Sequence, residues 1–197
     1  EKCEGIVEQL DLCKKSLADF LDGRRRQFPR YYFTSEADLL DILSNGSQPR
    51  KIMHHTPKVY LCSKTFVLSD EENLTADGRP YANGFIANVG KEEVDLEPPV
   101  PLDGKVEIYM QTLLDAMKLT LFQNLQRSLV RYNQLARHDW VMFKNEEKNR
   151  PEDPAQIILL ALAVNYVQEV EEALEMMQQG NPDAMRLYSD KQIEQLS

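Results

Sequence analysis

Residues 17–33 read LADFLDGRRRQFPRYYF, and this stretch decides the fold. Leu17 and Leu21 continue an apolar face that recurs at every third or fourth residue from the start of the chain, which predicts a long helix. Proline cannot continue a helix, so Pro29 predicts that this helix ends near Phe28. Directly after the basic run at 24–26, aromatic residues become frequent.

Four aromatic rings within six residues predict a packing junction, because each ring can remove a large apolar area from water. The single tryptophan follows a later helical pattern and is expected to anchor packing in the same way. The predicted structural junction comprises Phe28, Pro29, Arg30, Tyr31, Tyr32, Phe33 and Trp140.

The rest of the chain is mostly helical in pattern, with one change of period. Residues 58–68 are rich in strand formers, and two extended runs around Gly90 predict a β-hairpin over 85–96. Residues 97–101 are expected to form an extended connector, followed by the longest helix from 103 to about 138. The predicted fold is mainly α, an elongated helical bundle with a small β-hairpin insertion.

The predicted fold has three segments: N-terminal helices and the aromatic junction in 1–57, the hairpin insertion and proline connector in 58–101, and a long-helix bundle in 102–197. The region 157–164 is apolar all round, which predicts a central core element. Helical pattern at both ends of the sequence favours a segment of a longer chain.

Composition excludes several classes of function. The 197 residues carry a net charge of −9, which argues against general nucleic-acid binding, and the apolar runs are too short to span a bilayer. No GxxxxGK[ST] phosphate-binding loop or nucleophile motif occurs, so neither an enzymatic site nor a cofactor is expected within this segment. Cys3, Cys13 and Cys62 have no metal-binding spacing and are expected to be buried; adjacent His54 and His55 are not expected to face one metal on a helix.

The order of these motifs resembles the linker region of dynein heavy chains, most of all the axonemal outer-arm type. The residues that carry the resemblance are LADFL at 17–21, RR at 24–25, FPRYYF at 28–33, LLDILS at 39–44, PV at 99–100, GKVE at 104–107, PAQ at 154–156 and VEEAL at 170–174. The DGRRR turn at 22–26 and the DLEPPV connector at 95–100 favour the axonemal type.

The resemblance implies a non-catalytic lever arm that bends and straightens across a ring of AAA+ ATPase modules, giving the power stroke of a microtubule motor. It implies that ATP and Mg belong to that ATPase ring, and that the partners are the ring, dynein intermediate and light chains, and microtubules, without nucleic acid or membrane. The implied location is cytoplasmic and cytoskeletal, in the axoneme of a cilium or flagellum.

A lone hairpin is unstable in water unless it packs on something, which can be its own bundle, a symmetry mate or a partner. The resemblance implies that the hairpin meets the ATPase ring. Its candidates for docking on the ATPase ring are Val89, Gly90, Lys91, Glu92 and Glu93. Three other readings stay open: a static α-helical scaffold or interaction module, an RNA-binding module that uses 24–32, and a hydrolase with an unrecognised carboxylate pair.

Overall fold

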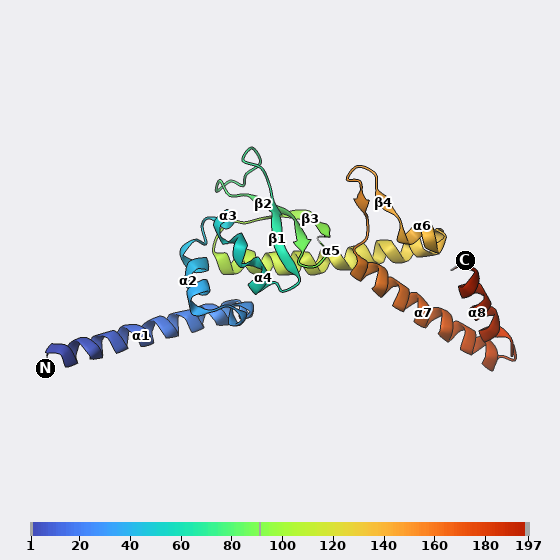
Figure 1. The fold of residues 1–197 in the computed structure, drawn as a ribbon, viewed down its shortest axis with the longest axis horizontal. Coiled ribbons are helices and arrows are strands. Elements are labelled where there is room, and N and C mark those ends of the chain that lie inside the picture. Colours follow the sequence, from blue (N-terminus) through green and yellow to red (C-terminus); the bar gives the residue numbers. More distant parts are fainter. Residues whose placement is uncertain (1, 91, 196–197) are drawn as a thin grey trace. The chain divides into compact units, whose positions relative to one another are not determined.

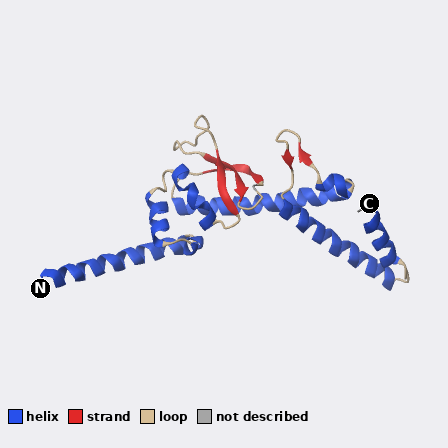
Figure 2. Ribbon diagram, in the orientation of Figure 1, coloured by secondary structure: helices blue, strands red, loops and turns tan. Residues whose placement is uncertain are grey.

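The computed structural model describes residues 2–90 and 92–195, and it is mainly α with a small antiparallel β insertion, as predicted. The chain forms two compact units, Glu1–Lys118 and Leu119–Ser197. Both boundaries predicted from the sequence, after residues 57 and 101, fall inside the first unit. Figures 1 and 2 show the order of the elements and the two places where the described residues form strands.

The first unit begins with one long helix and continues through short helical pieces. Helix α1 ends one residue before Phe28, where Pro29 opens a 3-10 turn, so the predicted end of the helix is confirmed. Ser35 caps α2, since its hydroxyl accepts from the Asp38 backbone N–H at 3.1 Å. The helical elements are α1 (Lys2–Gln27), η1 (Pro29–Phe33), α2 (Glu36–Ser44), α3 (Pro49–Ile52), η2 (Met53–His55) and α4 (Thr56–Val59).

A three-stranded antiparallel sheet follows, in the order β1 (Ser63–Leu68), β2 (Tyr81–Ala87) and β3 (Glu93–Pro101). The predicted hairpin is present as β2 and β3. Residues 97–101, expected to be a connector, instead complete β3, because Val100 and Pro101 pair with β2. The register is irregular between the pairs at Ala82 and Gly84, and this irregularity accommodates the two prolines at 98–99, which have no N–H to donate.

Helix α5 (Val106–Gln134) begins in the first unit, beside α4 and the sheet (Figure 1). Tyr60 is buried and donates its hydroxyl to the Met110 carbonyl at 2.6 Å. Tyr109 is also buried and donates to the Gly46 carbonyl at 2.9 Å. These two phenols hold the first turns of α5 against the segment that precedes the sheet.

The end of α2 differs from what its sequence indicates. An Asn-Gly pair at the end of a helix is typical of a left-handed cap, but Asn45 has φ −103° and ψ 13°, and its backbone N–H donates to the Asp41 carbonyl. Gly46 serves close packing instead. A Cβ at this position would lie 3.0 Å from the Cβ of Val106, which is tighter than ordinary van der Waals contact.

In the second unit the later part of α5 is followed by α6 (Arg137–Val141), α7 (Ala155–Gln178) and α8 (Ala184–Glu194). The predicted helix through residue 138 is broken at Ala136, whose φ −60° and ψ 149° are extended. The charged segment that follows α6 contains the short antiparallel pair β4 (Lys144–Asn145) and β5 (Arg150–Pro151).

The apolar run of helix α7 is not buried all round, contrary to the prediction of a central core element. Ile157 and Ala161 are buried, but Leu159 is 67% exposed. Within its unit α7 packs mainly on α8, and one neighbouring helix covers only one stripe of a helix. No helix among residues 2–90 and 92–195 is long and apolar enough to cross a membrane.

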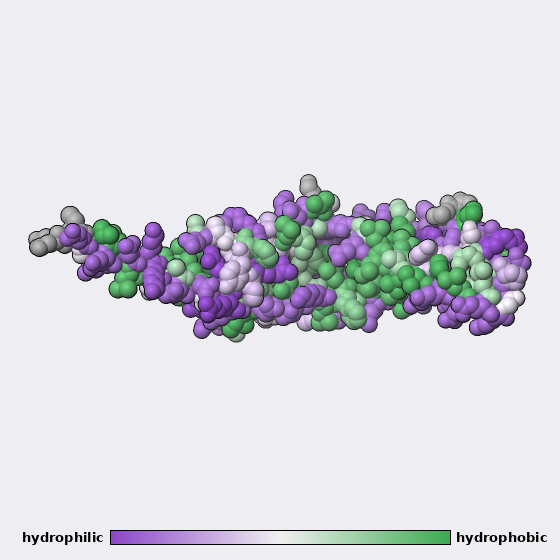
Figure 3. Space-filling model, turned by 90° about the horizontal axis from the view of Figure 1, so that it is seen from below, coloured by the Kyte–Doolittle hydropathy of each residue, from purple (hydrophilic) through white to green (hydrophobic). Residues whose placement is uncertain are grey.

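Much of the α1 apolar face is also exposed. Leu21 is buried, whereas Ile6 and Leu10 are 56% and 62% exposed. In the space-filling view, the N-terminal part of α1 shows green apolar residues among purple hydrophilic ones (Figure 3). The prediction of buried cysteines is wrong for Cys13 and Cys62, which are both exposed, and the Cys3 side chain lies outside the described part of the chain.

Candidate functional site

The aromatic stretch after α1 divides into a buried pair and an exposed pair. Phe28 and Tyr31 are completely buried and meet edge to face, with ring centroids 4.9 Å apart. Pro29 starts η1, and this turn sets the two rings against each other. Arg30 donates to the Val59 carbonyl at 3.2 Å, so it fastens η1 to α4.

The other two rings face outward, against the expectation that all four pack. Tyr32 is 56% exposed and Phe33 is 75% exposed. The Tyr32 hydroxyl donates to Asp22 Oδ1 at 3.0 Å, and this hydrogen bond, together with one from Arg26, lowers the pKa of the Asp22 carboxyl. Tyr32 therefore lies against α1 through a polar contact rather than in the core.

An ion pair that sequence reasoning did not locate lies beside this junction. Arg24 Nη1 donates to Glu107 Oε1 at 2.9 Å, and the Glu107 side chain is only 6% exposed. Arg26 pairs with Asp22 on the surface. Two of the three arginines in the basic run are thus bound to acids, and this speaks against a role in binding RNA.

The hairpin tip is the turn that connects β2 to β3. Ala87 N–H donates to the Glu92 carbonyl at 2.7 Å and closes the turn. Gly90 has φ 79°, a conformation that favours glycine, and the Val89 side chain is 86% exposed. Glu92 is half-buried and Glu93 exposed, while Lys91, also predicted to dock, lies outside the described residues.

Trp140 belongs to the second unit and is buried there. Its indole N–H lies 3.2 Å from both the carbonyl and the hydroxyl oxygen of Ser128, and its ring meets Tyr132 edge to face at 5.1 Å. Near it, Arg131 pairs with the buried Asp153 at 2.5 Å. The tryptophan thus joins α6 to the later part of α5.

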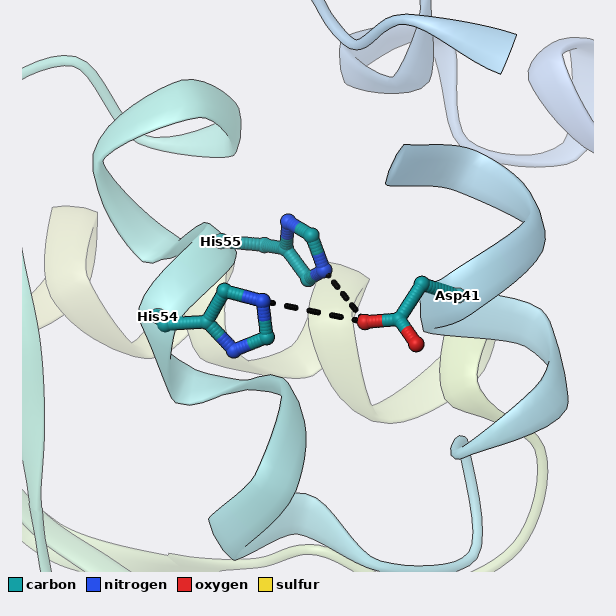
Figure 4. A group of neighbouring side chains, drawn as sticks. All are labelled: Asp41, His54 and His55. Atoms are coloured by element: carbon teal, nitrogen blue, oxygen red, sulfur yellow. Dashed lines mark hydrogen bonds and ion pairs between the residues drawn. The ribbon is translucent and has the colours of Figure 1, made fainter. Parts of the chain in front are cut away.

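The two adjacent histidines lie together, contrary to the argument that helical neighbours diverge. Their ring centroids are 3.8 Å apart, and both Nε2 atoms face Asp41 Oδ2, at 3.7 Å from His54 and 2.7 Å from His55 (Figure 4). The adjacent sequence positions of the two histidines do not predict this grouping, because the Asp41 carboxylate that both rings face belongs to another helix, α2. The hydrogen bond from His55 lowers the pKa of the Asp41 carboxyl.

Comparison with known proteins matches residues 1–128 to the family model "Dynein heavy chain, N-terminal region 2". The chain is 36% identical to the "Dynein alpha chain, flagellar outer arm" of Chlamydomonas reinhardtii over 96% of its own length. It is 33% identical to human "Dynein axonemal heavy chain 17" and 32% identical to the "Dynein beta chain, ciliary" of Tripneustes gratilla, each over its full length. It spans 4% of the length of each of these relatives.

Proposed function

The chain belongs to the N-terminal region of the axonemal dynein heavy chains, and from this premise we propose that it is part of the linker, the lever arm of the motor. In this proposal it is non-catalytic and bends and straightens across the AAA+ ATPase ring of the same heavy chain. The parent chain would then bind ATP and Mg in that ring, hydrolyse ATP and move along microtubules.

The exposed hairpin tip is the observation that best supports a docking role for the first unit. Val89 is apolar and 86% exposed, on a turn in which the Ala87 N–H donates to the Glu92 carbonyl. The same unit offers a fixed base for the tip, because the buried aromatic pair and the Arg24–Glu107 pair connect α1, η1 and α5. A tip on such a base can dock and release as the ring changes state.

The proposal extends to location and partners. The names of the relatives refer to flagellar outer arms and cilia, and we place this chain in the cytoskeleton of the axoneme by analogy. Through the parent complex it would associate with dynein intermediate and light chains and with microtubules.

The test uses the full-length heavy chain and microtubule gliding. Val89→Asp and Glu93→Lys change the hairpin tip and are expected to slow gliding while ATP hydrolysis continues, because the arm loses its contact with the ring. Asp77→Lys, another exposed acid-to-lysine change in the first unit, is the matched control and should leave gliding unchanged.

A static scaffold predicts the same gliding velocity for all of these variants. The exposed apolar residues of α1 and α7 are the observation in favour of that alternative, since such surfaces suit contact with other parts of a large assembly. Unchanged gliding with Val89→Asp and Glu93→Lys would overturn the docking proposal.

A further inference from the structure

The geometry points to a zinc site formed by Asp41, His54 and His55, which joins the end of α2 to the turn η2. The three side chains offer ligand atoms that all lie within 4.8 Å of one another. Two imidazole nitrogens and one carboxylate oxygen form a donor set that zinc accepts, with a water in the fourth position.

The distances suit the metal. Two bonds of about 2.1 Å at the tetrahedral angle separate neighbouring ligand atoms by about 3.4 Å. The observed distances from Asp41 Oδ2, 2.7 Å to His55 Nε2 and 3.7 Å to His54 Nε2, lie on either side of that value. Small side-chain rotations therefore admit an ion between all three groups (Figure 4).

His54 already presents a lone pair to this position. Its Nδ1 lies 2.8 Å from the Lys51 carbonyl, which can only accept, so Nδ1 carries the proton. In the neutral ring Nε2 then has no proton and faces a carboxylate oxygen, and a bound cation would satisfy both acceptors. The side chain is 63% exposed, which leaves a path for the ion from solvent.

His55 supplies an independent sign of a ligand site. It is 3% exposed, and its buried Nδ1 has no hydrogen-bond partner, with Asp38 Oδ1 3.6 Å away. When a metal takes Nε2, the ring proton moves to Nδ1, without net release from this histidine, and points toward that carboxylate. A carboxylate behind a metal-bound histidine fixes the ring and strengthens the ligand.

The third ligand is also oriented from behind. Asn45 Nδ2 donates to Asp41 Oδ1 at 2.9 Å and leaves Oδ2 turned toward the histidines. Two of the three ligands are therefore held by an outer hydrogen bond, from His54 to the Lys51 carbonyl and from the Asn45 amide to Asp41, while the Asp38 carboxylate lies 3.6 Å from the third, His55. Exposed histidines that meet an acid by chance lack this arrangement, as His138 beside Asp139 illustrates.

The experiment titrates the 197-residue chain with Zn²⁺ in competition with a chromophoric chelator. The cysteines are first changed to serine, because exposed thiols bind zinc. We expect one equivalent to bind with micromolar affinity or better, and added Zn²⁺ to raise the thermal unfolding midpoint. His54→Gln should weaken binding at least tenfold, while His138→Gln, the matched control, should not change it.

His55 is buried, so His55→Gln could unfold the chain; Asp41→Asn provides the second test on a partly exposed ligand. Co²⁺ in place of Zn²⁺ should give the absorption of a tetrahedral nitrogen and oxygen site without a sulfur charge-transfer band. Binding that survives both His54→Gln and Asp41→Asn, or affinity weaker than millimolar, would overturn the site.

Discussion

Changing Arg24 to Met tests whether the pair with Glu107 holds α1 to the start of α5. Methionine keeps an apolar stem at this position but leaves a carboxylate with 6% side-chain exposure without its cation. Breaking a buried ion pair in this way costs about 3–5 kcal/mol. Glu107 lies in the first turn of α5, where the helix dipole still stabilises the unpaired carboxylate by up to about 1 kcal/mol. We therefore expect Arg24→Met to lower the free energy of unfolding by about 2–4 kcal/mol.

Urea denaturation followed by circular dichroism measures this loss, while Trp140 fluorescence follows the second unit separately. Arg26→Met is the matched control, because Arg26 lies two residues away with 76% side-chain exposure and its replacement should leave the free energy of unfolding nearly unchanged. In a double-mutant cycle with Glu107→Gln, the combined loss should be smaller than the sum by about 2 kcal/mol. Equal losses for Arg24→Met and Arg26→Met, or strict additivity in the cycle, would refute the reasoning.

Three further predictions concern packing and charge. Gly46→Ala should lower the urea midpoint, with a cost of about 1–3 kcal/mol, because its Cβ would press on Val106 at 3.0 Å; an unchanged midpoint would contradict the close approach. Trp140→Phe removes the indole donor and should lower the free energy of unfolding of the second unit by about 1–3 kcal/mol. A loss below about 0.5 kcal/mol, which is typical of a surface substitution, would argue against that hydrogen bond. The hydrogen bond from Lys58 holds the pKa of Asp38 at about 2, so its stabilising effect should be present above the ordinary carboxyl pKa and lost as pH falls through about 2. Carboxyl NMR should show that Lys58→Met raises this pKa, and an unmoved titration would exclude Lys58 as the cause.

The parts of the fold that the sequence predicts best depend on local interactions. Pro29 ends α1 wherever the rest of the chain lies, and Ser35 caps α2 through a bond to a residue three positions away. The turn at Gly90 likewise requires a conformation that few other residues adopt. These features could be located to within a residue or two from spacing and residue type alone.

Features that depend on a distant partner could not be predicted in this way. An apolar stripe indicates that a helix can pack, but not whether a neighbour covers it, and for this reason Leu10 and Leu159 proved exposed. The length of β3 depends on pairing with β2, which overrides the unfavourable prolines at 98–99.

The same distinction between local and distant interactions applies to the candidate site. The aromatic spacing singled out Phe28 and Tyr31, but did not distinguish these buried rings from the exposed Tyr32 and Phe33. The grouping of His54 and His55 with Asp41 depends on α2 folding back toward η2 across a dozen residues, and no local pattern encodes that approach.

The prolines of β3 have a consequence for how the first unit behaves in concentrated solution. β3 is an outer strand of its sheet, and an outer strand normally presents a row of unpaired N–H groups that a second chain can join. Pro98, Pro99 and Pro101 have no N–H, so the second half of β3 offers fewer donors than its length implies. Edge-to-edge aggregation through the second half of β3 is therefore disfavoured by these prolines.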